Sequence, residues 1–373
     1  MRDAVEIGLG KAASRGYHLD DVAIVPSRRT RDVDDVSTAW QLDAYQFGIP
    51  CVAHPSDATM SPTTAVALGR LGGLGVLNAE GLWTRYEDPS KILSELAELR
   101  DPVAATSRLQ EVYAEPILPE LVGERIRELR EGGATVAVRV SPQHTLALAP
   151  VILDAGVDVL VIQGTIVSAE HVSTSDEPLN LKEFIADLDL PVVVGGCTNY
   201  QTALHLMRTG AAGVIVGIGA DAYATTDRVL GIRVPMATAI ADAAAARRDY
   251  LDETGGRYVH LIADGQLRTS GDIAKALGCG ADAVMLGEPL SRAAEAPAGG
   301  AWWHSAASHP KLPRGALRLA EPPLGTLEQL LFGPADQPDG TMNLFGGLRR
   351  AMAKCGYRDL KEFQRVGLVL DGP

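Results

Sequence analysis

Eight short apolar runs bounded by glycine or proline constrain the fold of this chain more than any other feature. Each run is mostly apolar without strict alternation, whereas a strand with one solvated face would alternate, so parallel strands covered on both faces are indicated. The runs are, in chain order, IPCVAHP (49–55), LGVLNAEG (74–81), TVAVRVSP (135–142), VDVLVIQG (157–164), PVVVGGC (191–197), GVIVGIG (213–219), YVHLIADG (258–265) and ADAVMLGE (281–288).

Helical patterns lie between these runs. Four of them end in a glycine suited to a helix C-terminus: SPTTAVALGRLG (61–72), LAPVILDAG (148–156), YQTALHLMRTG (200–210) and SGDIAKALGCG (270–280). Eight buried strands that alternate with helices predict an α/β fold, a (β/α)8 TIM barrel with its core at about residues 48–300.

Two segments fall outside the predicted barrel. Residues 18–40 have the pattern of a short N-terminal strand pair, and a proline-rich C-terminal extension begins near Trp302 and ends in a helix near residues 346–363. The stretch between the second and third strands, 82–134, has room for extra helices but not for an inserted domain of ordinary size. We therefore expect one domain over residues 1–373.

Charge and cysteine content exclude several classes of function. The formal net charge of −13 offers no basic surface for nucleic acid or anionic membranes. No run reaches the length of a membrane span and the N-terminus lacks a signal-peptide pattern, so we expect a cytoplasmic protein. The four cysteines contain no CxxC pair, and neither they nor the eight histidines show metal-ligand spacing, so no metal site is predicted.

Ligands of such barrels bind at the C-terminal ends of the strands. Glycines follow the sixth, seventh and eighth strands there, where backbone N–H groups can approach a phosphate closely. His54 follows the first strand, and we expect a structural role for it. The carboxylates of the rim suit proton transfer or a divalent cation, but they equally suit a solvated surface; they are Asp57, Glu80, Asp221, Asp264 and Glu288.

Five stretches resemble the IMP dehydrogenase/GMP reductase family, and the likeness covers nearly the whole chain in order. They are DDVAIVPS (20–27), LGRLGGLGVLN (68–78), GIGADAYATT (217–226), ADGQLRTSGDIAKALGCGADAVMLG (263–287) and FGGLRRAMAKCGYRDL (345–360). The chain is most similar to an actinobacterial IMP-dehydrogenase-related branch that lacks the inserted CBS-domain pair. The resemblance implies a purine nucleotide ligand, an NAD(P) cofactor if the protein is active and none otherwise, and a homotetramer.

The resemblance also implies a set of nucleotide-binding residues that this chain keeps. They are Gly217, Gly219, Thr225, Thr226, Asp264, Gly265 and Gly287. In the family, a cysteine in the loop after the sixth strand attacks the purine, and hydride then passes to or from a nicotinamide. That cysteine aligns with Ala224, whose methyl group cannot act as a nucleophile.

Further family positions are altered. Ala222 and Glu288 replace serines that bind phosphate, and Gln266 replaces a glycine beside the ribose-binding Asp264. Gln163 aligns with an aspartate that contacts the cofactor, and Ser56 aligns with a methionine that packs under the base. The segment 313–347 is too short for the family's mobile flap with its Arg-Tyr pair.

Three interpretations follow. The first is a pseudoenzyme of purine (guanine) nucleotide metabolism that binds a ligand or assembles with a relative. The second is a working NAD(P)-dependent IMP dehydrogenase or GMP reductase with a relocated nucleophile, for which Cys197 is the one cysteine at the correct rim. The third is a new acid–base or metal chemistry on the same barrel, because this fold hosts many reactions.

Overall fold

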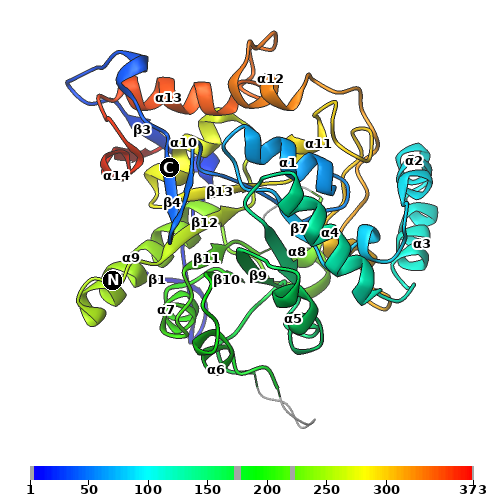
Figure 1. Ribbon diagram of the computed structural model, residues 1–373. Coiled ribbons are helices and arrows are strands. Elements are labelled where there is room, and N and C mark those ends of the chain that lie inside the picture. Colours follow the sequence, from blue (N-terminus) through cyan, green and yellow to red (C-terminus); the bar gives the residue numbers. More distant parts are fainter. Residues whose placement is uncertain (1–3, 172–177, 219–222, 372–373) are drawn as a thin grey trace.

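A closed ring of parallel strands forms the centre of the computed structural model, which describes residues 4–171, 178–218 and 223–371 (Figure 1). Each of the eight apolar runs contains one of these strands, which confirms the predicted barrel. The strands are β6 (Cys51–Ala53), β7 (Val76–Asn78), β8 (Ala137–Val140), β9 (Val159–Gln163), β10 (Val192–Cys197), β11 (Gly213–Val216), β12 (His260–Asp264) and β13 (Ala283–Leu286).

Hydrogen bonds run around the sheet in the order β6-β13-β12-β11-β10-β9-β8-β7. The two ends of this order meet just before β7, where the Leu74 N–H donates to the Cys51 carbonyl and the Ala53 N–H donates to the Leu74 carbonyl, both at 2.8 Å. The barrel strands are largely buried on both faces, in agreement with their mostly apolar sequences.

Helices surround the barrel (Figure 1). They are α1 (Pro62–Arg70), α2 (Ser90–Glu98), α3 (Pro102–Val112), α4 (Pro119–Glu131), α5 (Thr145–Asp154), α6 (Leu181–Ala186), α7 (Tyr200–Arg208), α8 (Thr226–Leu230), α9 (Met236–Thr254), α10 (Ser270–Gly278) and α11 (Glu288–Ser291). The four glycines predicted to end helices all have positive φ, the conformation that favours glycine; they are Gly72, Gly156, Gly210 and Gly280.

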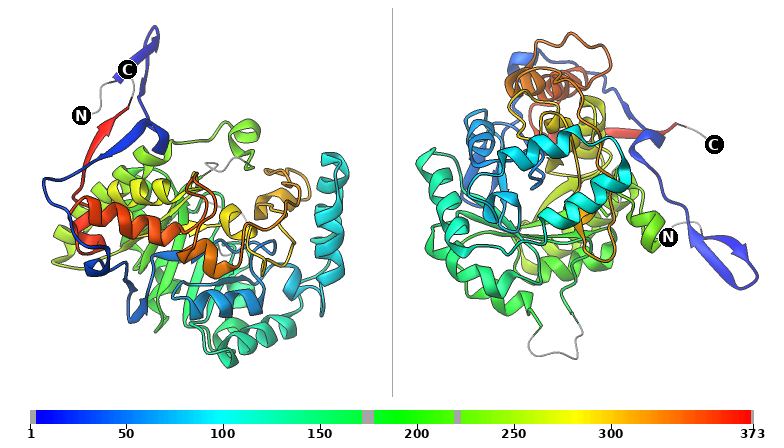
Figure 2. Two further views of the ribbon diagram at one scale, coloured as in Figure 1. Left: turned by 90° about the horizontal axis from the view of Figure 1, so that it is seen from above. Right: turned by 90° about the vertical axis from the view of Figure 1, so that its right-hand side faces the viewer.

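The N-terminal strands differ from the expectation in one respect. Residues 18–40 hold one complete strand, β3 (Val22–Val25), and its antiparallel partner is β14 (Gly367–Leu370), from the other end of the chain. The remaining terminal strands form two hairpins, β1 (Ala4–Gly8) with β2 (Lys11–Ser14) and β4 (Trp40–Leu42) with β5 (Tyr45–Phe47). In both views of Figure 2, β1 and β2 extend away from the barrel.

Parts of two long segments lie at the mouth of the barrel, and residues 302–314 of the C-terminal extension line it. The stretch after β7 contains η3 (Leu82–Thr84), α2, α3 and α4, and the C-terminal extension contains η4 (Ser305–Ser308), α12 (Leu327–Phe332), α13 (Leu344–Lys354) and α14 (Leu360–Phe363). Trp302 and Trp303 of the extension pack with Leu93 of α2 and Leu109 of α3 in a second, smaller core. This core holds the extension over the strand ends.

Among the helices of the described residues, none is long and apolar enough to cross a membrane.

Candidate functional site

A cavity of about 560 Å³ opens at the C-terminal ends of the barrel strands and is called the mouth cavity below. Its position agrees with the rule that predicted the site. Nine predicted positions line it: Gln163, Gly217, Ala224, Thr226, Asp264, Gly265, Gln266, Gly287 and Glu288. Gly219, Asp221 and Ala222 lie outside the described residues.

Two predicted positions are not among the residues that line the cavity. Ser56 is buried, and its hydroxyl donates to the Trp303 carbonyl at 2.8 Å, so it anchors the C-terminal extension. The backbone N–H of Thr225 donates to the Arg314 carbonyl at 3.3 Å, while the neighbouring Thr226 reaches the wall. The Ser56 hydroxyl therefore already has a partner within the protein, and ligand binding by Thr225 stays a prediction.

Cys197 does not fit the role of a relocated nucleophile. Its side chain is 1% exposed, it does not line the mouth cavity, and burial raises the pKa of the thiol to about 12. A thiol with that pKa is protonated at neutral pH, and the thiol is a far weaker nucleophile than the thiolate. The sequence placed Cys197 at the correct rim, but its side chain points into the packed core.

The loop that carries the family's cysteine is held against the C-terminal extension. Ala224 forms an antiparallel bridge with Gly315, and the Ala316 N–H donates to the Tyr223 carbonyl at 2.8 Å. Gly217 has a φ of +147°, and a Cβ there would collide with the Asp264 carbonyl. The glycine is thus required for the close packing of β11 against β12 beneath this loop.

Glu288 lines the corner where the sequence predicted phosphate. The buried guanidinium of Arg318 lies beside it, with 3.7 Å between Arg318 Nε and Glu288 Oε1. A neighbouring cation offsets part of the repulsion that a carboxylate would exert on an anionic ligand. Across the corner, the side chain of Gln266 reaches out to the ring of His18 at 2.8 Å.

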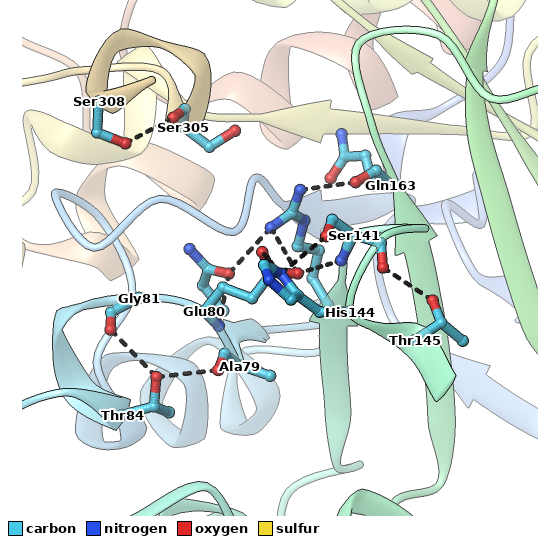
Figure 3. Close-up of polar contacts among 12 residues, drawn as sticks. Ala79, Glu80, Gly81, Thr84, Ser141, His144, Thr145, Gln163, Ser305 and Ser308 are labelled. Carbon is cyan, nitrogen blue, oxygen red and sulfur yellow. Dashed lines mark hydrogen bonds and ion pairs between the residues drawn. The ribbon is translucent and has the colours of Figure 1, made fainter. Parts of the chain in front are cut away.

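A partly buried ionic network forms the opposite wall (Figure 3). Glu80 Oε1 lies 3.5 Å from the Arg139 guanidinium, and Glu80 Oε2 lies 2.9 Å from His144 Nδ1. The Ser141 N–H also donates to Glu80. Burial raises the pKa of Glu80, but the charge of Arg139 and the hydrogen bonds of His144 and Ser141 outweigh it and lower that pKa to about 2. Glu80 is therefore ionised at neutral pH, and both of its carboxylate oxygens already contact protein groups.

Two further rim carboxylates of the described residues, Asp264 and Asp57, accept hydrogen bonds within the protein. Gln163 Nε2 donates to Asp264 Oδ2 at 3.1 Å, and Asp57 is 1% exposed and accepts from the Tyr113 hydroxyl at 2.5 Å. Asp57 is therefore no part of a solvated surface, whereas Asp264 and Glu288 are half-buried and line the cavity. In the described residues, no group of three histidine, cysteine or carboxylate side chains could hold a metal ion.

A structural role was expected for His54, and the structure places its ring at the cavity wall. It is 2% exposed and lines the mouth cavity, yet neither ring nitrogen has a hydrogen-bond partner among the described residues. A buried histidine with a purely structural function normally has its ring nitrogens satisfied.

Several wall residues were missed by reasoning from the sequence. Arg139 could have been found, because it is a charged residue inside an otherwise apolar strand run. Tyr113, at the end of α3, and Trp302 and His304 of the extension carried no such signal, because their positions depend on how the covering segments fold over the barrel.

A family model for the IMP dehydrogenase / GMP reductase domain matches residues 16–316. The chain belongs to this family. It is 61% identical over 374 residues to an uncharacterized oxidoreductase of Mycobacterium tuberculosis, covering 99% of this chain and 100% of the relative. The inosine-5'-monophosphate dehydrogenase of Methanocaldococcus jannaschii is 25% identical over 475 residues, covering 94% of this chain and 92% of that protein.

A crystal structure of an IMP dehydrogenase/GMP reductase-like protein from Corynebacterium glutamicum superposes with a TM-score of 0.94 at 54% identity. It covers 99% of this chain and 98% of that chain. Relatives from mycobacteria and Corynebacterium agree with the predicted actinobacterial IMP-dehydrogenase-related branch of the family.

Proposed function

We propose that this protein binds a purine nucleotide in the mouth cavity and does not carry out the family's thiolate-dependent redox reaction. The observation that supports this most strongly is Ala224, which lines the cavity where the family has its cysteine. Removal of a nucleophile typically costs on the order of 10⁴ to 10⁶ in rate. In the described wall of the cavity no cysteine takes its place.

Persistence of the nucleotide site is supported by the residues that remain. Gly217, Asp264, Gly265 and Gly287 all line the cavity, and Asp264 stands at the end of β12. Arg318 offsets part of the charge of Glu288 in the corner assigned to phosphate. We therefore propose that the nucleotide has its ribose near Asp264 and its phosphate near Gly287.

The family uses NAD, but the position that should contact the cofactor does not fit it. Gln163 stands where the family has an aspartate, and its amide nitrogen already donates to Asp264 and lies 3.5 Å from the Met285 sulfur. Gln163 thus offers an amide and not a carboxylate at the position where the family contacts the cofactor. We derive no hydride-transfer step, and we propose that the protein acts without NAD(P).

The remaining features of the proposal concern the whole chain. We propose a single barrel domain without CBS domains, a homotetrameric assembly like that common in the family, and a cytoplasmic location. The helices that follow β7, α2 to α4, occupy the stretch between the second and third barrel strands.

A turnover assay tests the absence of redox chemistry. Purified protein is incubated with IMP and NAD⁺, and separately with GMP and NADPH, and the nicotinamide absorbance is followed. We expect a rate that is the same with and without enzyme. Nucleotide-dependent turnover that survives in the Cys197→Ala variant would contradict the proposal, and turnover that this variant abolishes would restore the relocated-nucleophile interpretation.

A further inference from the structure

His54 is a buried polar side chain whose hydrogen-bonding capacity is unused. It directly follows β6, it is 2% exposed, and both Nδ1 and Nε2 lack a partner among the described residues. Unpaired buried polar groups are destabilising, so native proteins pair nearly all of them. Because His54 lines the mouth cavity, a bound molecule can supply the missing partner.

The side chains around His54 hold its ring in position but form no hydrogen bond with its ring nitrogens. The ring lies edge-on to Trp302, with 5.3 Å between the ring centroids, and 4.8 Å from the ring of His304. Both neighbours come from the C-terminal extension. His304 Nδ1 accepts a hydrogen bond from the Ala306 N–H at 3.2 Å, which fixes the orientation of that ring. The imidazole of His54 is thus positioned by packing at the wall of the cavity.

The charge state of His54 limits what it can recognise. Burial, together with the nearby His304 and Arg139, holds the pKa of His54 well below its ordinary value. The ring is therefore neutral at pH 7, with one N–H donor and one acceptor nitrogen. Its complement is an uncharged group that both accepts and donates.

We propose that His54 is a ligand-recognition residue that hydrogen-bonds an uncharged donor–acceptor group of the bound nucleotide, either a sugar hydroxyl or the lactam of the base. This inference rests on the proposed function, because it assigns one wall of the same cavity. The recognised group then lies on the side of the cavity at β6. The backbone N–H of His54 ties this end of β6 to the neighbouring strand β13, because it donates to the Leu286 carbonyl at 2.8 Å.

The first test measures IMP binding by calorimetry in His54→Phe and His54→Gln. Phenylalanine keeps the ring and removes both polar atoms, and we expect it to weaken binding on the order of tenfold. Glutamine keeps a donor and an acceptor, and we expect a smaller loss. The control is His205→Gln on the exposed face of α7, for which we expect unchanged binding. Equal binding by His54→Phe and the wild type would overturn the inference.

The second test separates recognition from a structural role. His54→Phe loses no hydrogen bond within the unliganded protein, so we expect its Tm without ligand to equal or exceed that of the wild type. A clear fall in the Tm of unliganded His54→Phe would overturn the inference, because it would show that His54 carries a contact that supports the fold.

The third test identifies the group recognised. Purine riboside 5'-monophosphate lacks the lactam, and 2',3'-dideoxyinosine 5'-monophosphate lacks the sugar hydroxyls. We expect the effect of His54→Phe to vanish for one of these two ligands, as a double-mutant cycle requires for a direct contact. If His54→Phe weakens the binding of both ligands as much as that of IMP, the inference about His54 is overturned and the proposed function is not. A wild-type protein that binds none of the nucleotides overturns the proposed function as well.

Discussion

Ala224 illustrates how one residue can change the chemistry of the mouth cavity relative to the family. It is partly exposed to the mouth cavity, whereas Cys51, Cys197 and Cys355 are buried and Cys279 is half-buried. Burial raises the pKa of every one of these four thiols. Three of the native thiols are thus inaccessible, and all four have raised pKa values, which makes them slow to alkylate.

The variant Ala224→Cys tests the position of this residue. We expect the folded wild type to react slowly with iodoacetamide and the variant to gain one rapidly labelled thiol, because the new side chain faces the cavity. IMP is expected to protect that thiol. Mass spectrometry of the labelled protein counts the modified sites, with the unfolded wild type as the control for full labelling. A variant that labels no faster than the wild type would show that Ala224 does not face an open cavity.

Asp57 gives a pH dependence with a definite sign. Burial raises its pKa from the ordinary 3.8 to about 6, despite the hydrogen bond from Tyr113. The folded state then binds a proton that the unfolded state releases between these two values. This contribution to stability is fully present below pH 3.8 and is lost as the pH rises through about 6.

The Asp57→Asn variant removes this titration while keeping an oxygen that accepts from Tyr113. Between pH 4 and pH 8, the difference in unfolding free energy between variant and wild type is expected to change by about 3 kcal/mol, in favour of the variant at high pH. Urea denaturation at a series of pH values measures it. Parallel pH profiles for the two proteins would contradict the raised pKa.

At the scale of elements, a single carboxylate joins the C-terminal segment to the base of the barrel. Asp282 precedes β13 and is 2% exposed. It contacts Arg247 of α9 at 2.5 Å, Lys361 of α14 at 2.6 Å and the Tyr258 hydroxyl at 2.6 Å. Burial raises its pKa, but the two cations outweigh it and lower the pKa to about 2. The cluster therefore stays ionised at neutral pH.

Removal of the Asp282 charge takes away the carboxylate that the buried Arg247 guanidinium contacts. Asp282→Asn is accordingly expected to lower the free energy of unfolding at pH 7 by about 3–5 kcal/mol. Glu253→Gln is the control, because it breaks the exposed ion pair between Glu253 and Arg208 and is expected to change little. Chemical denaturation measures both variants, and equal small effects would contradict the assigned role of Asp282.

The elements of the barrel could be predicted from the sequence because their signal is local. Each barrel strand lies in a mostly apolar run. Four of the helices were predicted to end at glycines, and these glycines have positive φ. The partner of β3 could not be predicted in this way, because β14 lies more than 340 residues further along the chain. The same limit applies to Ser56, whose rim position was correct but whose hydroxyl bonds to Trp303 of the distant extension.

At the scale of the whole molecule, the β1–β2 hairpin presents apolar side chains to solvent. Val5, Ile7 and Leu9 are all exposed, and the hairpin extends away from the barrel (Figure 2). An isolated two-stranded hairpin is marginally stable in water. This observation supports the proposed homotetramer, in which such a hairpin can pack against another copy.

Light scattering coupled to size-exclusion chromatography tests this assembly. We expect a mass of four chains at micromolar concentration. A monomer at all concentrations would contradict the homotetramer without affecting the proposal for the ligand, since residues of a single chain line the mouth cavity.

The most direct test of the central claim is calorimetric titration of the wild-type protein with IMP and then with GMP. The central claim is that the mouth cavity retains a purine nucleotide site although Ala224 has replaced the nucleophile. We expect saturable binding of at least one of the two nucleotides, with a Kd on the order of micromolar, about −8 kcal/mol. Failure of both nucleotides to bind would contradict the claim and would show that the nucleotide site was lost together with the cysteine.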